Sequence, residues 1–309
     1  MNYDVNIYRG KELESTHRVL LTDINSKEGF NLYLRSSFKP FQLLPFVSKG
    51  GVEEFSLDES ALALFTSSHS GEKIHTDYLQ QVLKNNNINE NQLFCSPHWP
   101  LNNDRTRELA SSGQTPTKVH NNCSGKHTAM LLMCKLFGFS MDNYISITDD
   151  LQVFLFDYLS NIFDYKLQKI AIDGCGLPIP YLDSKNVVDT ADKLNKGAGE
   201  ESNAWNRILN SMKENPYLVA GTGRFDSVVM DESNKQLAAK AGAEGVIFLQ
   251  SDNDTLIIKS MDGSRRGVDL LAAYIARENG LLEGFEFQEE KEILYNRQGQ
   301  LVGSIEILK

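Results

Sequence analysis

The sequence lacks the features that define several large classes of protein. No apolar run approaches the ~20 residues needed to cross a bilayer, and residues 1–4 are not followed by the basic and apolar segments of a secretory signal. Basic residues do not cluster, since Arg265-Arg266 is the only adjacent pair, and the formal net charge is −10. Nucleic acids bind to clustered basic surfaces. We therefore expect a cytoplasmic protein with neither a nucleic-acid nor a membrane partner.

Cysteine is also scarce, with four residues in a chain of 309. Four cysteines are too few for a disulfide framework in a chain this long, so we expect them to bind a metal, take part in catalysis or pack in the core. The hydrophobic content of 41% and the charged content of 23% are typical of a globular protein with ample core. Without an internal repeat or a clear linker, we expect a single domain over residues 1–309.

Hydrophobic periodicity places strands near both ends of the chain and helices in the middle. Strands are predicted at residues 17–23, 31–35, 168–172, 245–250 and 255–260, with a C-terminal hairpin at 292–295 and 301–308. Helices are predicted at residues 36–47, 58–67, 73–84, 104–112, 124–137, 149–163, 200–214 and 266–278. This order favours an α+β fold, in which an antiparallel sheet from both chain ends packs against helices, with a helical lobe.

The segment Ser36-Ser37-Phe38-Lys39 connects a predicted strand to a predicted helix. Ser36 and Lys39 are three residues apart and share a helical face, whereas Ser37 and Lys39 do not. A serine needs an adjacent base to act as a nucleophile, and a lysine whose pKa is lowered by burial can be that base. The same four residues also fit an ordinary helix start with a solvated lysine, because Ser-x-x-Lys occurs often by chance.

Two later segments extend this pattern. Ser68 lies in a serine-rich turn at residues 67–72, and Lys259 ends an apolar strand. The order Ser-x-x-Lys, serine and late lysine loosely resembles that of serine β-lactamases, although Ser-Asp-Asn and Lys-Thr-Gly are absent. A polar helix end and an edge-strand charge are the plainer interpretations of these two residues.

Cys123 and Cys175 both lie in glycine-containing turns. Cys123 precedes a helix for which Ser124 can act as N-cap, and a helix start favours the thiolate. Thiolates bind zinc well. Lys126 shares a helical face with Cys123, but lysine is a rare metal ligand, so His127 is the more conventional candidate for a further ligand. Two small residues packed at tight turns would show the same pattern.

Two glycine-containing segments follow. Residues 220–226 lack a phosphate-loop pattern, so we interpret them as a tight loop in which Arg224 is free to bind a carboxylate. Residues 240–245 are predicted to form a close-packed turn that leads into a strand.

Six ordered segments together resemble the asparaginase II family of the Rhizobium inducible type. They are residues 35–42, 67–72, 120–127, 173–178, 220–226 and 242–245. The resemblance implies a serine β-lactamase-like fold, a homodimer and hydrolysis of L-asparagine to aspartate and ammonia. It also implies that Ser36 and Lys39 form a nucleophile–base tandem, and that Ser68 is a second catalytic serine with Lys259 as its partner.

The resemblance further implies a zinc ion that aids substrate binding. Its ligands would be Cys123, Lys126 and Cys175, with Asp173 holding a metal-bound water and His127 placed beside the ligands rather than among them. Substrate contacts are expected from Arg35, Asn122 and Arg224.

Two alternative functions remain open at this point. One is a Ser-Lys amidase acting on glutamine or a β-lactam, because a pocket separates substrates that differ by one methylene by only ~1–3 kcal/mol. The other is a catalytically silent protein that binds a metal or an amino acid. The presence of Ser36, Lys39 and Ser68 argues against the second alternative, since a binding protein needs no nucleophile.

Overall fold

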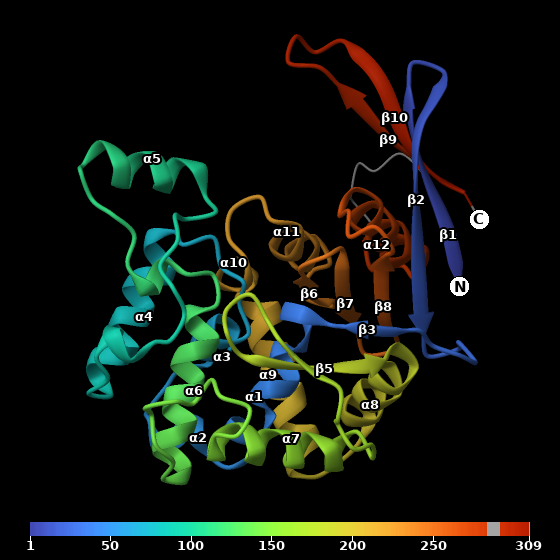
Figure 1. Cartoon of the computed structure of the whole chain (residues 1–309). Coiled ribbons are helices and arrows are strands. Elements are labelled where there is room, and N and C mark those ends of the chain that lie inside the picture. The colour runs from blue at the N-terminus through green and yellow to red at the C-terminus, as the bar shows by residue number, and fades with distance from the viewer. Residues whose placement is uncertain (283–290, 309) are drawn as a thin grey trace.

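The structure is a computed structural model that describes residues 1–282 and 291–308 (Figure 1). Within these residues the main sheet has seven antiparallel strands in the order β6-β7-β8-β2-β1-β10-β9. The strands are β1 Asn2–Arg9, β2 Glu12–Asp23, β6 Ala238–Gly242, β7 Val246–Gln250, β8 Thr255–Ser260, β9 Lys291–Tyr295 and β10 Leu301–Leu308. The prediction of an antiparallel sheet built from both chain ends is therefore confirmed.

A smaller sheet of three strands lies apart from the main one. It contains β3 (Asn31–Tyr33), β5 (Pro178–Asp183) and β4 (Ile170–Ile172), in that order. The strands predicted at residues 17–23 and 31–35 consequently belong to different sheets. The prediction of a buried strand at residues 168–172 was wrong, because β4 is an edge strand and Ile172 is 61% exposed.

Helices pack on both faces of the main sheet (Figure 1). Helix α12 contacts β2, β7, β8 and β10 on one face, whereas α8 and α9 contact β2, β6 and β8 on the other. Helices α2 to α7 form a lobe beside the sheet, as predicted. The helices are η1 Arg35–Phe38, α1 Lys39–Ser48, α2 Gly51–Glu54, α3 Glu59–Phe65, α4 Lys73–Asn85, η2 Glu90–Gln92, α5 Asn103–Ser111, η3 Lys118–His120, α6 Ser124–Phe137, α7 Asp150–Ile162, α8 Ser184–Lys196, α9 Glu200–Glu214, α10 Pro216–Val219, α11 Phe225–Glu232 and α12 Arg266–Glu278. The likeness to the serine β-lactamase fold stays a prediction.

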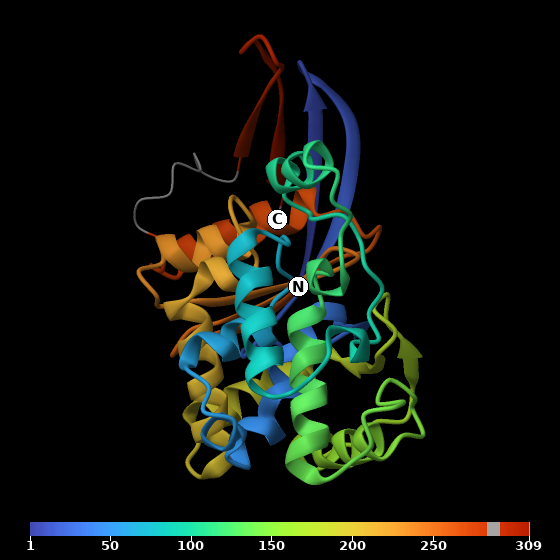
Figure 2. The same cartoon turned by 90° about the vertical axis from the view of Figure 1, so that its left-hand side faces the viewer.

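One end of the main sheet extends beyond the helices. Figure 2 shows this end as the blue and dark red strands that rise above the rest of the molecule. Leu13, Tyr295 and Leu301 lie in these strands with exposed side chains. In the part of the chain that the structure describes, no helix combines the length and the apolar character needed to cross a membrane.

Helix α1 passes through the centre of the molecule, with nine of its ten residues buried. Phe41 packs against Trp205 with a distance of 4.5 Å between ring centroids. The sequence predicted a short or bent helix because of Pro45, and α1 is short but continues beyond this proline. Lys39 is the first residue of this buried helix, so its side chain lies in the protein interior, where it is 1% exposed.

Candidate active site

Three segments meet at the candidate active site: η1 with the start of α1, the loop at residues 66–72, and strand β6. Helix η1 packs directly on β6 because Gly242 has no side chain. A Cβ atom at Gly242 would lie 2.4 Å from the carbonyl oxygen of Leu34. Ser37 Oγ also donates a hydrogen bond of 2.6 Å to the carbonyl oxygen of Lys240. These contacts fix the start of α1 relative to β6.

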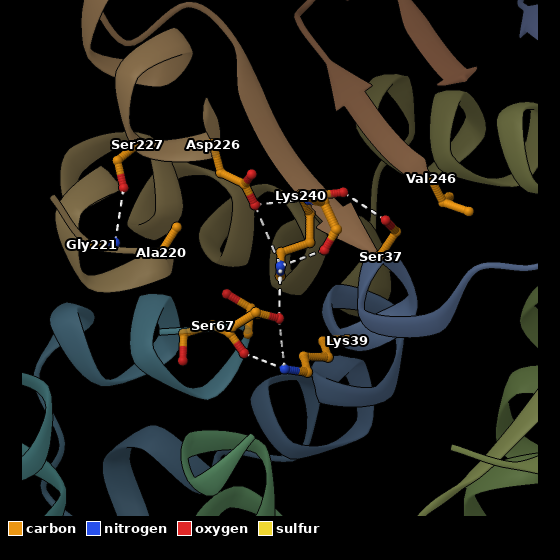
Figure 3. A network of polar contacts seen from close by, with 12 residues as sticks. Ser37, Lys39, Ser67, Ala220, Gly221, Asp226, Ser227, Lys240 and Val246 are labelled. Atoms are coloured by element: carbon orange, nitrogen blue, oxygen red, sulfur yellow. Dashed lines mark hydrogen bonds and ion pairs between the residues drawn. The ribbon is translucent and has the colours of Figure 1, made fainter. Parts of the chain in front are cut away.

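The side-chain amines of two buried lysines, Lys39 and Lys240, both contact the hydroxyl of Ser68. Figure 3 labels the two lysines. The Nζ atoms of Lys39 and Lys240 each lie 3.1 Å from Ser68 Oγ. Lys39 also donates to the carbonyl oxygen of Ser67, and Lys240 donates to that of Ala241 at 2.8 Å. A hydroxyl that contacts two amines away from water is well placed to exchange a proton with them.

Burial lowers the pKa of both Lys39 and Lys240, because a charged amine loses hydration in the protein interior. The pKa of Lys240 falls to about 7, although the carboxylate of Asp226, 3.5 Å away, raises it. At neutral pH a large fraction of Lys240 is therefore uncharged. An uncharged amine next to Ser68 can accept the proton of its hydroxyl.

Ser36 lies in η1, where its side chain is partly buried. The backbone N–H of Lys39 donates a hydrogen bond to the carbonyl oxygen of Ser36, but within the described residues no side-chain hydrogen bond joins the two, and the amine of Lys39 bonds to Ser67 and Ser68 instead. The two residues belong to successive elements, since η1 ends at Phe38 and α1 begins at Lys39. The structure thus brings Lys39 to Ser68, and the Ser36–Lys39 tandem stays a prediction.

Lys259 lies in β8. Its amine donates hydrogen bonds to the carbonyl oxygens of Glu244, at 2.7 Å, and Ser260. In the described residues the hydroxyl of Ser68 contacts Lys240 and not Lys259, so the pairing of Lys259 with Ser68 stays a prediction that these contacts do not support. The sequence had assigned Lys240 to a turn, but it belongs to β6, a strand in which every residue is buried.

Lys39, Ser68 and Lys240 form a first cluster. Cys123 and Cys175 form a second cluster near Lys39. The hydrogen bond between the two thiols raises the pKa of Cys123 to about 12 and lowers the pKa of Cys175 to about 5. Lys126 is 2% exposed, and burial lowers its pKa, but the charges of Cys175 and Cys123 outweigh burial and leave that pKa raised. The charges of Cys123, Lys126 and Cys175 also act on the pKa of Lys39, which shows that the two clusters are neighbours.

Helix α6 delivers Lys126 to this cluster by packing closely on α3. A Cβ atom on Gly125 would lie 2.0 Å from the carbonyl oxygen of Leu64, so only glycine permits this approach. The sequence predicted Ser124 as the N-cap of α6, but the N-cap residue is Cys123. Ser124 is the first helical residue, and its hydroxyl donates a hydrogen bond of 2.9 Å to the carbonyl oxygen of Val119.

Asp173 and Arg35 complete the second cluster. Arg35 Nε donates a hydrogen bond of 2.7 Å to Asp173 Oδ1. Burial raises the pKa of Asp173, but the charge of Lys126 and the hydrogen bond from Arg35 outweigh it and lower that pKa. Arg35 also has a φ angle of 54°, an unusual left-handed conformation for a residue with a side chain.

The residues predicted to hold a metal offer two sulfur atoms and one amine, from Cys123, Cys175 and Lys126. Over residues 1–282 and 291–308 no group of three or more His, Cys, Asp or Glu side chains is arranged to hold a metal ion, so a site here needs Lys126 as a ligand. His127 instead hydrogen-bonds to the hydroxyl of Tyr144 at 2.7 Å, and burial lowers its pKa to about 3. One thiol already poised as a thiolate suits zinc, whereas the amine of Lys126, whose pKa is raised in the metal-free protein, would have to lose its proton before it could bind the ion.

Asn122 and Arg224 lie next to the two clusters, and both are partly buried. Asn122 immediately precedes Cys123, and its backbone N–H donates a hydrogen bond of 2.9 Å to His98 Nε2. Arg224 is the N-cap residue of α11, and its charge contributes to lowering the pKa values of Asp226 and Lys240. Both residues therefore lie near the clusters, and their contact with a substrate stays a prediction.

Comparison with known proteins identifies the family. The family model for L-asparaginase II matches residues 5–307, nearly the whole chain. The chain belongs to the L-asparaginase II family. Membership in the L-asparaginase II family implies an amidohydrolase, so the predicted family and enzyme class are confirmed. A search of curated proteins finds no match.

Sequence reasoning did not single out two residues of this L-asparaginase II site, Lys240 and Asp226. Lys240 follows the apolar run at residues 237–239, and a lysine inside such a run is a signal of a buried amine. Asp226 ends the segment at residues 220–226, in which only Arg224 was considered. The roles of these two residues became visible only when the fold placed β6 and α11 beside Ser68.

Proposed function

We propose that this enzyme hydrolyses the side-chain amide of L-asparagine to aspartate and ammonia by means of a serine hydroxyl activated by lysine amines. The observation that carries the proposal is the 3.1 Å contact of Ser68 Oγ with both Lys39 Nζ and Lys240 Nζ. A neutral amine at this distance can take the hydroxyl proton while the oxygen attacks the amide carbon. Family membership supplies the substrate class.

The two lysines have different roles in this proposal. Lys240, whose pKa burial lowers to about 7, takes the serine proton and passes it to the departing ammonia. Lys39 donates to Ser68 and keeps the hydroxyl oriented toward Lys240. A water molecule then gives a proton to the same amine of Lys240 and attacks the aspartyl ester. The amine returns this proton to the serine oxygen as the ester bond breaks, which releases aspartate and regenerates the hydroxyl.

Two serines can carry the aspartyl ester. The family resemblance favours Ser36 with Lys39 as its base, whereas the hydrogen bonds favour Ser68 with Lys240. Reaction with a slowly hydrolysed aspartyl hydroxamate, followed by an acid quench and peptide mass spectrometry, identifies the acylated serine. Ser36→Ala and Ser68→Ala should each lower kcat by about 10³-fold or more, but only the variant that lacks the nucleophile should form no adduct. An adduct on neither serine would contradict covalent catalysis.

Arg35, Arg224 and Asn122 are proposed to bind the polar groups of asparagine. A guanidinium matches a carboxylate through two parallel hydrogen bonds. Asp173 already holds Arg35 through Nε, which orients the terminal nitrogens of this guanidinium. The charge of Arg224 acts on the pKa of Lys240, so this guanidinium lies near the reacting amine.

A zinc ion held by Cys123, Lys126 and Cys175, with Asp173 next to it, is a further part of the proposal. Support comes from the donor set and from the pKa of Cys175, which the hydrogen bond from Cys123 lowers to about 5. A bound zinc ion would supply Lewis acidity that helps to hold the substrate. The same residues contribute on their own by keeping charged groups in fixed positions beside Lys39.

The experiment that tests the proposed function is an assay of ammonia release from asparagine and glutamine, together with hydrolysis of a chromogenic β-lactam. We expect asparagine to be the preferred substrate. Preference for glutamine or the β-lactam would indicate a different Ser-Lys amidase, and binding of asparagine without turnover would indicate a silent binding protein. A homodimer in the cytoplasm is also proposed, and light scattering coupled to size exclusion measures its mass.

A further inference from the structure

Two side chains bind the peptide group that joins Lys240 to Ala241. Ser37 Oγ donates a hydrogen bond of 2.6 Å to the carbonyl oxygen of Lys240, and the N–H of Ala241 donates one of 2.8 Å to Asp226 Oδ2. The C=O and N–H bonds of a trans peptide point in opposite directions, and this peptide is trans. Ser37 and Asp226 therefore form hydrogen bonds to opposite edges of the same peptide group.

The carboxylate of Asp226 also reaches the side-chain amine of the same lysine (Figure 3). The distance from Lys240 Nζ to Asp226 Oδ2 is 3.5 Å, and the two side chains are 0% and 3% exposed. Asp226 thus contacts both the amine of Lys240 and the backbone that carries it. A long side chain needs such constraints if its amine is to stay within reach of Ser68.

The start of α11, which carries Asp226, is anchored independently of Lys240. Ser227 Oγ accepts a hydrogen bond of 3.1 Å from the N–H of Gly221 and donates one of 2.8 Å to the carbonyl oxygen of Pro216. The position of Asp226 therefore does not depend on its pairing with the lysine. For this reason we expect a change that removes only the charge of Asp226 to leave the backbone in place.

We propose that Asp226 is a positioning residue that aims the amine of Lys240 at Ser68 and determines, through its charge, the pH at which this amine gains a proton. The proposal deepens the proposed function and relies on it for the activity measurements. The titration of Lys240 tests it without any substrate.

The charged surroundings of Lys240 make the effect of Asp226 specific. Burial lowers the pKa of Lys240 most, and Asp226 contributes the largest opposing effect. Lys39 from α1 and Arg224 from the loop before α11 lower this pKa, and Cys123 raises it only slightly. Without the Asp226 carboxylate, the amine would face mainly positive neighbours.

The main test is Asp226→Asn, which keeps an oxygen acceptor for the N–H of Ala241 but removes the charge. In protein labelled with ε-¹³C-lysine, NMR measures the protonation midpoint of Lys240, whose signal is assigned by its absence from Lys240→Met. We expect the midpoint to fall by about 1–3 pH units, because losing a nearby anion disfavours the charged amine. The acid limb of the kcat/KM profile for asparagine should move to lower pH by the same amount.

Ser37→Ala is the matched control, since it removes the opposite contact to the peptide plane without changing any charge. It should lower kcat and leave the protonation midpoint of Lys240 unchanged. Asp226→Glu keeps the charge but displaces it, so kcat should fall while the acid limb stays near that of the wild type. This variant also provides the test if Asp226→Asn does not fold.

Two results would overturn the proposal. One is an Asp226→Asn variant whose Lys240 midpoint equals that of the wild type, and the other is an Asp226→Glu variant with wild-type kcat. If the wild-type enzyme releases no ammonia but the midpoint still moves in Asp226→Asn, the proposed function fails and the electrostatic role of Asp226 stands.

Discussion

Lys240 and Lys126 are both buried lysines, yet the electrostatic surroundings of their amines differ. Burial dominates at Lys240, which faces the single carboxylate of Asp226, and its pKa falls to about 7. At Lys126 the charges of Cys175, Cys123 and Asp173 outweigh burial, and its pKa rises. The number of anionic neighbours, and not the depth of burial, decides whether a buried lysine keeps its proton.

This difference separates two kinds of chemistry within one site. A lysine that is partly neutral at pH 7 can accept a proton from Ser68, whereas a cluster with balanced charges can hold an ion or a charged substrate group. The clusters are near enough for Cys123 and Cys175 to act on the pKa of Lys39. The following changes test whether the two lysines differ as described.

Removing the amine of Lys240 should have the largest effect. Lys240→Met should lower kcat with asparagine by about 10²–10⁴-fold, because the hydroxyl of Ser68 loses its base. Its melting temperature should fall, since the buried carboxylate of Asp226 loses its positively charged partner. Steady-state kinetics and thermal melting measure the two effects. A variant that keeps kcat within threefold of the wild type would show that Lys240 is not the base.

Removing a thiol of the second cluster should act mainly on binding. Cys175→Ser replaces an ionisable thiol with a hydroxyl, so Lys126 loses a compensating charge and the proposed zinc site loses a ligand. We expect KM to rise about ten- to hundredfold, with a smaller change in kcat, and the zinc content to fall. Elemental analysis and kinetics measure these changes, and Cys134→Ser, in the buried part of α6, is the control. Unchanged KM and metal content in Cys175→Ser would argue against both roles.

The pH dependence of stability should distinguish the two lysines in metal-free protein. The pKa of Lys240 lies near 7 in the folded state and near 10.5 in the unfolded state, so the unfolded chain binds more protons between these values. The free energy of unfolding of the wild type relative to Lys240→Met should therefore rise with pH in this window, by up to about 1.4 kcal/mol per pH unit.

The corresponding difference for Lys126→Met should not rise between pH 7 and about 10, because the pKa of Lys126 is raised. Urea unfolding at several pH values gives both differences. If the two differences in the free energy of unfolding changed equally with pH, the surroundings of the two lysines would not differ as the structure indicates.

The smallest effect is expected for Lys259. Its amine bonds to the carbonyl oxygens of Glu244 and Ser260, so Lys259→Met should change kcat/KM by no more than about threefold. The same kinetic assay as for Lys240→Met makes the two variants directly comparable. A loss of a hundredfold or more would favour the pairing of Lys259 with Ser68 that the family resemblance implied.

Local sequence patterns predicted part of the fold closely. Helices α6, α9 and α12 have the predicted bounds, because the spacing of apolar residues along a helix is a local property. Strand β6 was missed, since its short run of small residues around Lys240 resembles a turn when only the neighbouring residues are considered. The separation of β3 from the main sheet was also missed, because pairing between strands depends on residues far apart in the chain.

The sequence by itself determined the family, the enzyme class, most of the longer helices (α8 was missed) and the candidate residues Lys39, Ser68, Cys123 and Cys175. Residue type, spacing and motif order are sufficient for such assignments. Only the tertiary structure decided which lysine meets Ser68 and which lysine remains protonated. Both depend on distances between segments remote in sequence and on the loss of water around each amine, and neither quantity is contained in a local pattern of residues.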